Sequence, residues 1–326
     1  MKKCIALLLA LILLLSLAGC SEPGTAQTDS APSQTRQNSP DSGAEPSAEP
    51  ASDSPETTLP AEPATESPAP ELPERFEEIT AVDNDQCSVK ITGVELDSLW
   101  GYTLKLQLEN KSDSKTYMFA VDSAAVNGVS WDPFFAVELG PGLKKNGAIN
   151  FADAEKEALI RSFTDIELVF RIYDSKDWAA DDLVRETVHV YPLGQERAER
   201  YVRAPQPDDV VLADNDQITV ILTGFDTHPL WGYTAELYLE NKTDAPLVFA
   251  AEDVSVNGLL CDPYWAAKLA PGKQGFSGIS WSDASLQENG IQQVQTIELT
   301  LRVHDAELYD AEDLYAERLT LTPKAQ

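Results

Sequence analysis

One segment of this chain occurs twice, and this internal repeat limits the fold more than any other feature of the sequence. LWGYTLKLQLENKSD begins at Leu99, and LWGYTAELYLENKTD begins at Leu230. Shorter matches occur in the same order in both halves, 130 or 131 residues apart: DNDQ and TG before the segment, and VNG, DP, PG and IEL after it. Each copy spans about 115 residues, the size of an independent domain rather than of a solenoid unit. The repeat therefore predicts two tandem domains of one fold.

Within each copy, short alternations of apolar and polar residues are separated by turn residues, a pattern typical of β-strands. The Asn-Gly pairs at 127–128 and 257–258 predict tight hairpin turns, because both residue types tolerate positive φ. Only Asp153–Ile160 favours a short helix. Seven strands without crossover helices predict an antiparallel sandwich. In the first copy we expect these strands over Cys87–Leu96, Gly101–Glu109, Thr116–Val121, Phe134–Glu138, Ala148–Phe151, Asp165–Tyr173 and Arg185–Tyr191.

On a strand, alternate side chains of the repeated segment fall on opposite faces. One face carries Trp100, Tyr102 and three leucines, and it is nearly unchanged in the second copy. The other face reverses its charge where Lys105 becomes Glu236, which costs little if that face is solvated. We therefore interpret the shared face as core, with Trp100 and Trp231 inside the sandwich. The alternative is a bulge that turns both indoles outward as platforms for sugar rings.

The N-terminal residues MKKCIALLLALILLLSLAGC have the features of an export signal. Two lysines precede an apolar run from Ile5 to Leu15, shorter than the about 20 residues of a membrane span. Small residues then lead to Cys20, a pattern that resembles the lipobox of bacterial lipoproteins. The resemblance implies that residues 1–19 are a signal peptide, and that cleavage before Cys20 precedes diacylation of its thiol. The chain would then lie on the extracytoplasmic side of the cell membrane, held by lipid. The alternative is an uncleaved N-terminal anchor.

The segment that follows, residues 20–75, begins with this cysteine and is rich in Pro, Ser, Ala, Thr and Glu. It has almost no large apolar residues, so it cannot bury enough surface to offset its chain entropy. We expect a disordered, extended tether. The two sandwich domains are then expected over 76–193 and 210–326, joined by a linker over 194–209.

The charge of the chain bears on its partners. A formal net charge of −30 repels nucleic acid, so we expect no nucleic-acid partner. The same charge disfavours direct contact with anionic headgroups, so the lipid must provide the membrane anchor.

The cysteines, histidines and glycine-containing motifs of the sequence do not form a catalytic pattern. Cys87 and Cys261 lie at non-equivalent positions of the repeats, so we expect small buried side chains rather than a disulfide framework. The chain has three histidines, without metal-ligand spacing. It contains no nucleophile elbow and no phosphate-binding glycine loop. We therefore expect a protein that is not an enzyme and has no cofactor.

In each copy, one DND motif precedes the first expected strand. Their carboxylates, Asp83, Asp85, Asp214 and Asp216, are candidate calcium ligands. Adjacent residues supply only part of the about six to eight oxygens that Ca²⁺ takes. The alternative interpretation is an Asx turn that begins the strand.

Two acidic loops each contain one aromatic residue, Trp178 in SKDWAADDL and Tyr309 in AELYDAEDL. An aromatic ring among carboxylates can contact a basic peptide or protein partner. The alternative is a loop anchor packed on the edge of the sandwich. Trp178, Tyr309, Trp100 and Trp231 are the candidate ligand contacts.

The domain pair resembles the tandem immunoglobulin-like domains of unknown function found in lipoproteins of Gram-positive bacteria. The sequence thus predicts an all-β chain with two tandem antiparallel Ig-like β-sandwich domains after a disordered N-terminal stalk. The expected function is a non-enzymatic binding or interaction module of the cell envelope, with an envelope protein or a glycan as partner. The alternatives are a carbohydrate- or cell-wall-binding module and a purely structural envelope spacer.

Overall fold

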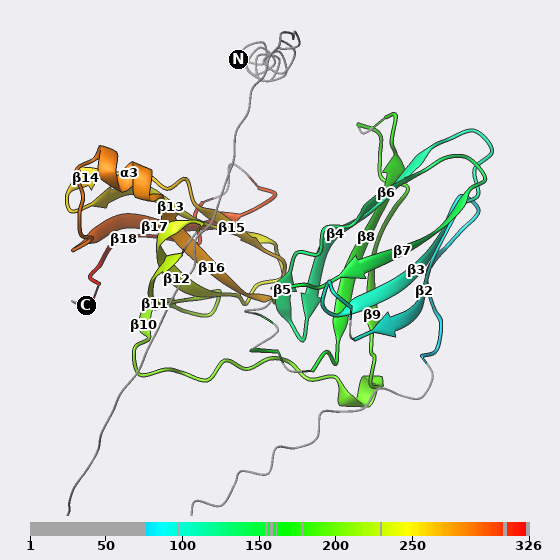
Figure 1. Cartoon of the computed structure of the whole chain (residues 1–326), viewed down its shortest axis with the longest axis horizontal. Helices are drawn as coiled ribbons and strands as arrows, with labels where there is room; N and C mark the ends of the chain where they lie inside the picture. Colours follow the sequence, from blue (N-terminus) through cyan, green and yellow to red (C-terminus); the bar gives the residue numbers. More distant parts are fainter. Residues whose placement is uncertain are drawn as a thin grey trace, which may run out of the picture. The chain divides into compact units, whose positions relative to one another are not determined.

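The computed structural model describes residues 76–96, 98–153, 156, 159–160, 162–177, 179–228, 230–308 and 312–323 (Figure 1). They belong to one compact unit, Thr65–Gln326. The expected signal peptide and tether lie outside the described residues, as does Cys20. Within the part of the chain that the structure describes, no helix has the length and apolar character needed to cross a membrane.

The first repeat forms two antiparallel sheets from nine strands among its described residues. One sheet has the order β1-β2-β3-β7. In the other, β4 pairs with β8, β8 pairs with β9, and β5 and β6 both pair with β4. The strands are β1 (Ile79–Asp83), β2 (Cys87–Glu95), β3 (Thr103–Asn110), β4 (Tyr117–Val126), β5 (Val129–Trp131), β6 (Ala136–Leu139), β7 (Lys144–Asn150), β8 (Ile166–Asp174) and β9 (Val184–Val190).

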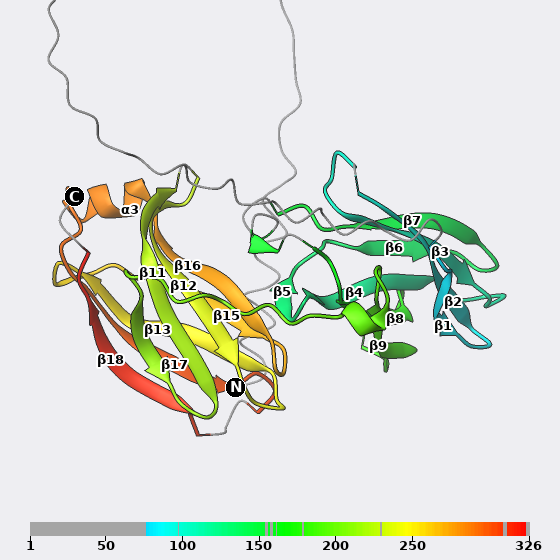
Figure 2. The same cartoon turned by 90° about the horizontal axis from the view of Figure 1, so that it is seen from below.

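The second repeat has the same topology. One layer has the order β10-β11-β12-β16, and β16 also pairs in parallel with β5 of the first repeat, Gln274 opposite Val129, so that this layer continues into the sheet of β5, β4, β8 and β9. In the other layer β13 pairs with β14, β15 and β17, and β17 pairs with β18. Figure 2 shows β11, β12 and β16 in one layer and β13, β17 and β18 in the other. The elements are β10 (Val210–Asp214), β11 (Ile218–His228), β12 (Gly232–Asn241), β13 (Leu247–Val256), β14 (Leu259–Leu260), β15 (Ala266–Leu269), β16 (Gln274–Trp281), α3 (Asp283–Glu288), β17 (Ile297–Asp305) and β18 (Tyr315–Leu321).

The expected fold class is therefore confirmed: the chain is all-β, with two tandem antiparallel sandwiches of the immunoglobulin-like type. The Asn-Gly turns are also confirmed, since Asn127 and Asn257 have φ of 51° and 53° and each is followed by a glycine with positive φ. The sequence interpretation missed β1, β5 and their counterparts in the second repeat. These strands have five residues or fewer, so little alternation is left to detect.

Each sandwich has its own hydrophobic core, filled by inward-facing residues of both sheets. In β3, Leu104, Leu106 and Leu108 are buried while Lys105 and Gln107 are exposed, as the period of two requires. Burying one such leucine contributes about 1.5–3 kcal/mol. Cys87 and Cys261 are buried free thiols in these cores.

The two cores differ in which of their sheets carries the buried tryptophan. In the first repeat Trp131, at the end of β5, packs edge-on against Phe151, with ring centroids 6.1 Å apart. In the second repeat Cys261 and Trp281 occupy the equivalent positions, and the indole Nε1 of Trp281 donates to the Cys261 carbonyl at 2.8 Å. The tryptophan thus lies in opposite layers of the two repeats. The residue type changes at both positions, but the summed side-chain volume changes less.

The segment expected as a linker packs against both repeats. It contains a short 3₁₀ helix, Gln195–Arg197. Tyr201 N donates to the Asn127 carbonyl at 2.8 Å, and Gln274 Nε2 donates to the Tyr201 carbonyl at 3.1 Å. Arg200 of the linker pairs with Glu240 of β12 at 3.4 Å, and a separate ion pair at 2.6 Å joins the repeats directly, between Lys273 and Glu167. The linker is therefore held by contacts along its length.

Candidate functional site

Trp100 and Trp231 lie on the surface, 66% and 63% exposed, so the interpretation that they fill the core is wrong. The reason is the glycine that follows each indole. Gly101 and Gly232 have φ of 72° and 83°, a left-handed conformation that an ordinary strand residue does not adopt. Alternation of faces holds only inside a regular strand, and this turn breaks it before β3 begins.

The structure also explains why the second copy needs glycine at this point. A Cβ on Gly232 would lie 2.3 Å from the carbonyl oxygen of Trp281, a backbone atom that cannot move aside. Position 232 therefore has to be glycine, and Leu230 and Trp231 form the exposed turn between β11 and β12, which are antiparallel.

The remainder of the repeated segment follows the sequence interpretation. The leucines of β3 are buried, and Tyr102 is half-buried and stacked on Phe163 with ring centroids 4.3 Å apart. Burial raises the pKa of the Tyr102 hydroxyl. Only the indoles at the start of the segment leave the shared face.

The sequence predicts a solvated outer face for β12, but in the structure part of this face is buried. Thr234 and Tyr238 are each only 5% exposed. The linker covers this face: the Arg203 guanidinium lies 5.5 Å from the Tyr238 ring centroid, and the Tyr201 ring lies 6.1 Å from that of Phe276. The linker lies outside the repeat, so the apolar–polar alternation of β12 does not predict this burial.

Beside this covered area lies a groove of about 900 Å³ on the outer face of β12 and β16. Its floor is polar, since Thr234 pairs in register with Ser280, and Glu236 pairs with Gly278. The Thr234 and Ser280 hydroxyls are 2.8 Å apart. The floor thus offers hydroxyl groups and one carboxylate.

The walls of the groove are aromatic. Trp231 belongs to the turn before β12, and Tyr264 and Trp265 come from the segment before β15. The Trp265 indole donates to Ser277 Oγ at 3.0 Å, which fixes its ring. Asp262 Oδ1 accepts from Tyr264 N at 2.8 Å and places a second carboxylate in the lining.

The first repeat carries the same exposed aromatics. Phe134 is 94% exposed and its counterpart Tyr264 is 92% exposed, each within the repeated Asp-Pro-aromatic-aromatic motif. The sequence interpretation missed this pair, although DPFF and DPYW recur at the fixed spacing and were a signal for it. The two copies differ in the floor, where Lys105 replaces Glu236 and pairs with Glu95.

The DND motifs form Asx turns. Asn84 Oδ1 accepts from Gln86 N at 2.8 Å and from Cys87 N at 2.9 Å, and Asn215 repeats the arrangement in the second copy. Hydrogen bonds from lysine lower the pKa of Asp83 and of Asp214, the partner of Asp214 being Lys242 at 2.8 Å.

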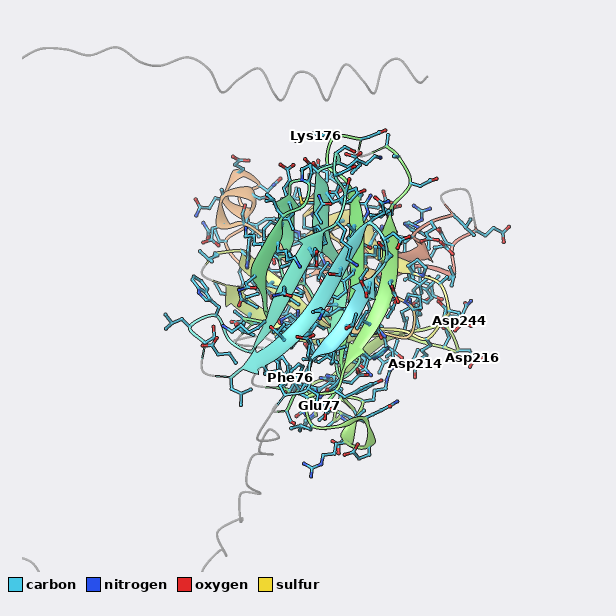
Figure 3. The ribbon with its side chains drawn as sticks, turned by 90° about the vertical axis from the view of Figure 1, so that its right-hand side faces the viewer. Phe76, Glu77, Lys176, Asp214, Asp216 and Asp244 are labelled. Atoms are coloured by element: carbon cyan, nitrogen blue, oxygen red, sulfur yellow. The ribbon has the colours of Figure 1, made fainter. Side chains whose placement is uncertain are left out.

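The four candidate calcium ligands are exposed side chains of these turns, and Figure 3 labels Asp214 and Asp216 at the surface. Asp85 and Asp216 follow the asparagine on each turn. Among the residues that the structure describes, no three His, Cys, Asp or Glu side chains come together as a metal site. The other two candidate ligand contacts, Trp178 and Tyr309, lie outside the described residues and stay predictions.

No family model and no curated protein matches the sequence. Among solved structures, the chain is similar to red sea bream transglutaminase, with 12% identity, a TM-score of 0.22, and coverage of 75% of this chain and 32% of that one. The chain thus spans about a third of the transglutaminase. A protein of unknown function from Porphyromonas gingivalis W83 shows 14% identity, a TM-score of 0.19, and coverage of 69% and 91%. Neither likeness identifies a family.

Proposed function

We propose that this chain is a cell-surface lipoprotein that acts as a non-enzymatic binding module of the cell envelope. Cys20 carries the lipid, and the Pro- and Glu-rich segment after it holds the two sandwiches away from the extracytoplasmic face of the membrane. Support for this anchor comes from the lysines, the apolar run and the small residues that precede Cys20. Support for the tether comes from a composition that cannot form a core.

The observation that carries the binding role is the duplicated exposed turn. Leu99 and Trp100, and again Leu230 and Trp231, are exposed large apolar side chains at equivalent positions. Exposed apolar surface of this size is unfavourable in water unless a partner covers it. Tryptophan is also enriched among the residues that dominate binding energy, each costing about 2 kcal/mol or more when truncated.

A carbohydrate- or cell-wall-binding module is the second candidate, because the same exposed indoles favour it. An indole face can pack against an apolar face of a sugar ring, and hydroxyl groups at the groove floor can hydrogen-bond to sugar hydroxyls. This candidate predicts retention on purified cell wall or glycans.

The lipid anchor is tested with Cys20→Ala in cells that express the full chain. We expect metabolic labelling with palmitate and recovery in the membrane fraction for the natural chain, and loss of both for the variant. A Cys20→Ala variant that keeps its label would refute acylation at this residue.

The binding role is tested by capture of envelope components on the immobilised full chain. We expect Trp100→Ala/Trp231→Ala to lose the captured component, while Leu308→Ala, which removes an exposed apolar side chain elsewhere, retains it. Capture that is unchanged by the double substitution would refute the role of the turns. Retention of purified wall glycan that depends on both tryptophans would favour the second candidate.

A further inference from the structure

We propose that a pocket in the second repeat binds a small aromatic molecule, whose ring takes the place that the Phe163 side chain has in the first repeat. The pocket has a volume of about 540 Å³, and none of its lining residues belongs to the groove beside Trp231. Its volume lies within the range of about 300–1,000 Å³ that small-molecule sites have. This ligand site is therefore separate from the exposed turns that carry the proposed binding role.

Aromatic and aliphatic side chains from several elements line this pocket. Phe225 comes from β11, and Tyr233 comes from the start of β12. Leu286, Ile291 and Val294 come from α3, which lies at one end of the sandwich (Figure 2), and from the segment that follows it. The lining also includes exposed amide and hydroxyl side chains, which can hydrogen-bond to a polar substituent of a ligand.

The position of Val294 is equivalent to that of Phe163 in the first repeat. The side chain of Asn127 bonds to the carbonyl of the residue before Phe163 and to the N–H of the residue after it, at 2.7 and 3.0 Å. Asn257 bonds in the same way to the residues on either side of Val294, both at 2.8 Å. Both asparagines belong to the repeated Asn-Gly turns, so the two positions correspond in structure although the residue type differs.

The first repeat fills this position with an aromatic ring. Phe163 is only 8% exposed, and its ring stacks on Tyr102 with centroids 4.3 Å apart and an interplanar angle of 24°. Val294 has no ring to place against Tyr233, the counterpart of Tyr102. Tyr233 stacks instead on Phe225 with centroids 5.8 Å apart, and both rings are walls of the pocket. The second repeat therefore has open space beside the tyrosine that the first repeat covers with its own ring.

The chemistry of these walls favours a planar ring as the occupant. A ligand ring would remove apolar surface from water, which is favourable by itself. Aromatic pairs also gain from offset or edge-on contact at centroid distances of about 4.5–7 Å, which a saturated ring of the same size cannot provide. The pair of Phe163 and Tyr102 shows that this fold accommodates a ring at the equivalent position.

The test uses the full chain in detergent and para-fluorophenol, observed by fluorine NMR, with the detergent alone as the blank. We expect saturable binding with a Kd of about 1 mM or below, the affinity that a single-ring ligand typically reaches. Cyclohexanol, which has no aromatic face, is expected to compete about two- to tenfold more weakly than phenol.

Two variants place the missing ring in the pocket. Val294→Phe is expected to weaken binding of para-fluorophenol at least about tenfold, because its own side chain occupies the site. Phe225→Val/Val294→Phe reproduces the two residues that the first repeat has at Val94 and Phe163, and it is expected to bind as weakly. The double variant decides the outcome if the single variant does not fold.

The matched control is Val211→Phe, the same exchange at an exposed position of β10 outside the pocket lining. It is expected to bind like the natural chain, and near-ultraviolet circular dichroism checks that each variant is folded. Absence of saturable binding, equal affinity for cyclohexanol, or unchanged affinity in the two pocket variants would overturn the inference. Tighter binding of N-acetylphenylalanine amide than of phenol would also overturn it, because the ring would then belong to a partner chain. The proposed binding role would survive these results if Trp100→Ala/Trp231→Ala still abolished capture of an envelope component.

Discussion

A buried asparagine at the end of β3 gives the sharpest test of the packing. Asn110 is fully buried, and its Nδ2 donates to the Lys115 and Leu139 carbonyls, both at 2.8 Å. Its Oδ1 accepts from Ser112 N at 3.0 Å. The side chain therefore ties the β3–β4 turn to the end of β6. Asn110→Asp keeps the size of the side chain and removes the two donors.

The cost follows from those two donors. Each net hydrogen bond contributes about 1 kcal/mol, and a buried acceptor left without a partner costs about 1–3 kcal/mol. When the introduced carboxyl group is ionised, both carbonyls lose their partner and face a negative charge, so we expect a loss of about 3–5 kcal/mol at pH 8. When that carboxyl group is protonated, it can donate to one carbonyl, which lessens the loss.

The sign of the pH dependence follows from this difference. Burial beside carbonyl oxygens raises the pKa of the introduced carboxyl group above its unfolded value of about 3.9. The folded variant then binds more protons than the unfolded chain, so its stability falls as pH rises above about 4. The slope is about 1.4 kcal/mol per pH unit until the folded pKa is reached. The deficit relative to Asn110→Ala is therefore smaller at pH 4 than at pH 8.

The assay is urea unfolding of the natural chain, Asn110→Asp and Asn110→Ala at several pH values between 4 and 8. Asn110→Ala has no new titrating group, so its deficit should not change with pH in the same way. Asn241 in the second repeat makes equivalent bonds to Ala245 and Leu269, at 2.8 Å and 3.2 Å, and serves as a replicate. A deficit of Asn110→Asp below about 1 kcal/mol, or one independent of pH, would refute the reasoning.

Three further predictions concern the two cores and the linker. Cys87 and Cys261 are both buried, so at pH 8 each should react with dithionitrobenzoate only as fast as the chain unfolds, and rapid labelling of the folded chain would contradict their burial. Burial also raises the pKa of the Cys87 thiol to about 11, which keeps this thiol protonated at pH 8. Hydrogen bonds from Arg203 lower the pKa of Asp209 to about 2, so the stabilisation by this pair should be complete above about pH 4 and lost as pH falls towards 2. Asp209→Asn should lack this component of the acid-induced fall in Tm, and an identical acid profile would argue against the pair. Trp281→Phe removes the indole donor to the Cys261 carbonyl and leaves a cavity, so urea unfolding should show a loss of about 2–3 kcal/mol. A loss below about 1 kcal/mol would mean that the core closes around the smaller ring.

Part of the candidate site could be predicted from the sequence. Trp100 and Trp231 are candidate ligand contacts because a bulge at the start of the strand can turn them outward, and the repeated DPFF and DPYW motifs could have added Phe134 and Tyr264. Glu236 could not be singled out among the many carboxylates of this chain. Its relevance depends on the groove around it, which segments distant in the sequence form together.

The sequence by itself determined the two copies of one all-β fold, the alternation within the central strands and the Asn-Gly hairpins. Each of these depends on neighbours in the chain, through the period of two along a strand and the φ angles that a residue type tolerates. Tertiary structure alone decided that Trp100 and Trp231 point outward and that Tyr238 is covered. The first outcome needs a left-handed glycine after each indole, which in the second repeat packs against the backbone of Trp281, and the second needs a linker that returns over the sheet. Both arise from contacts between residues far apart in the sequence, which a local pattern does not record.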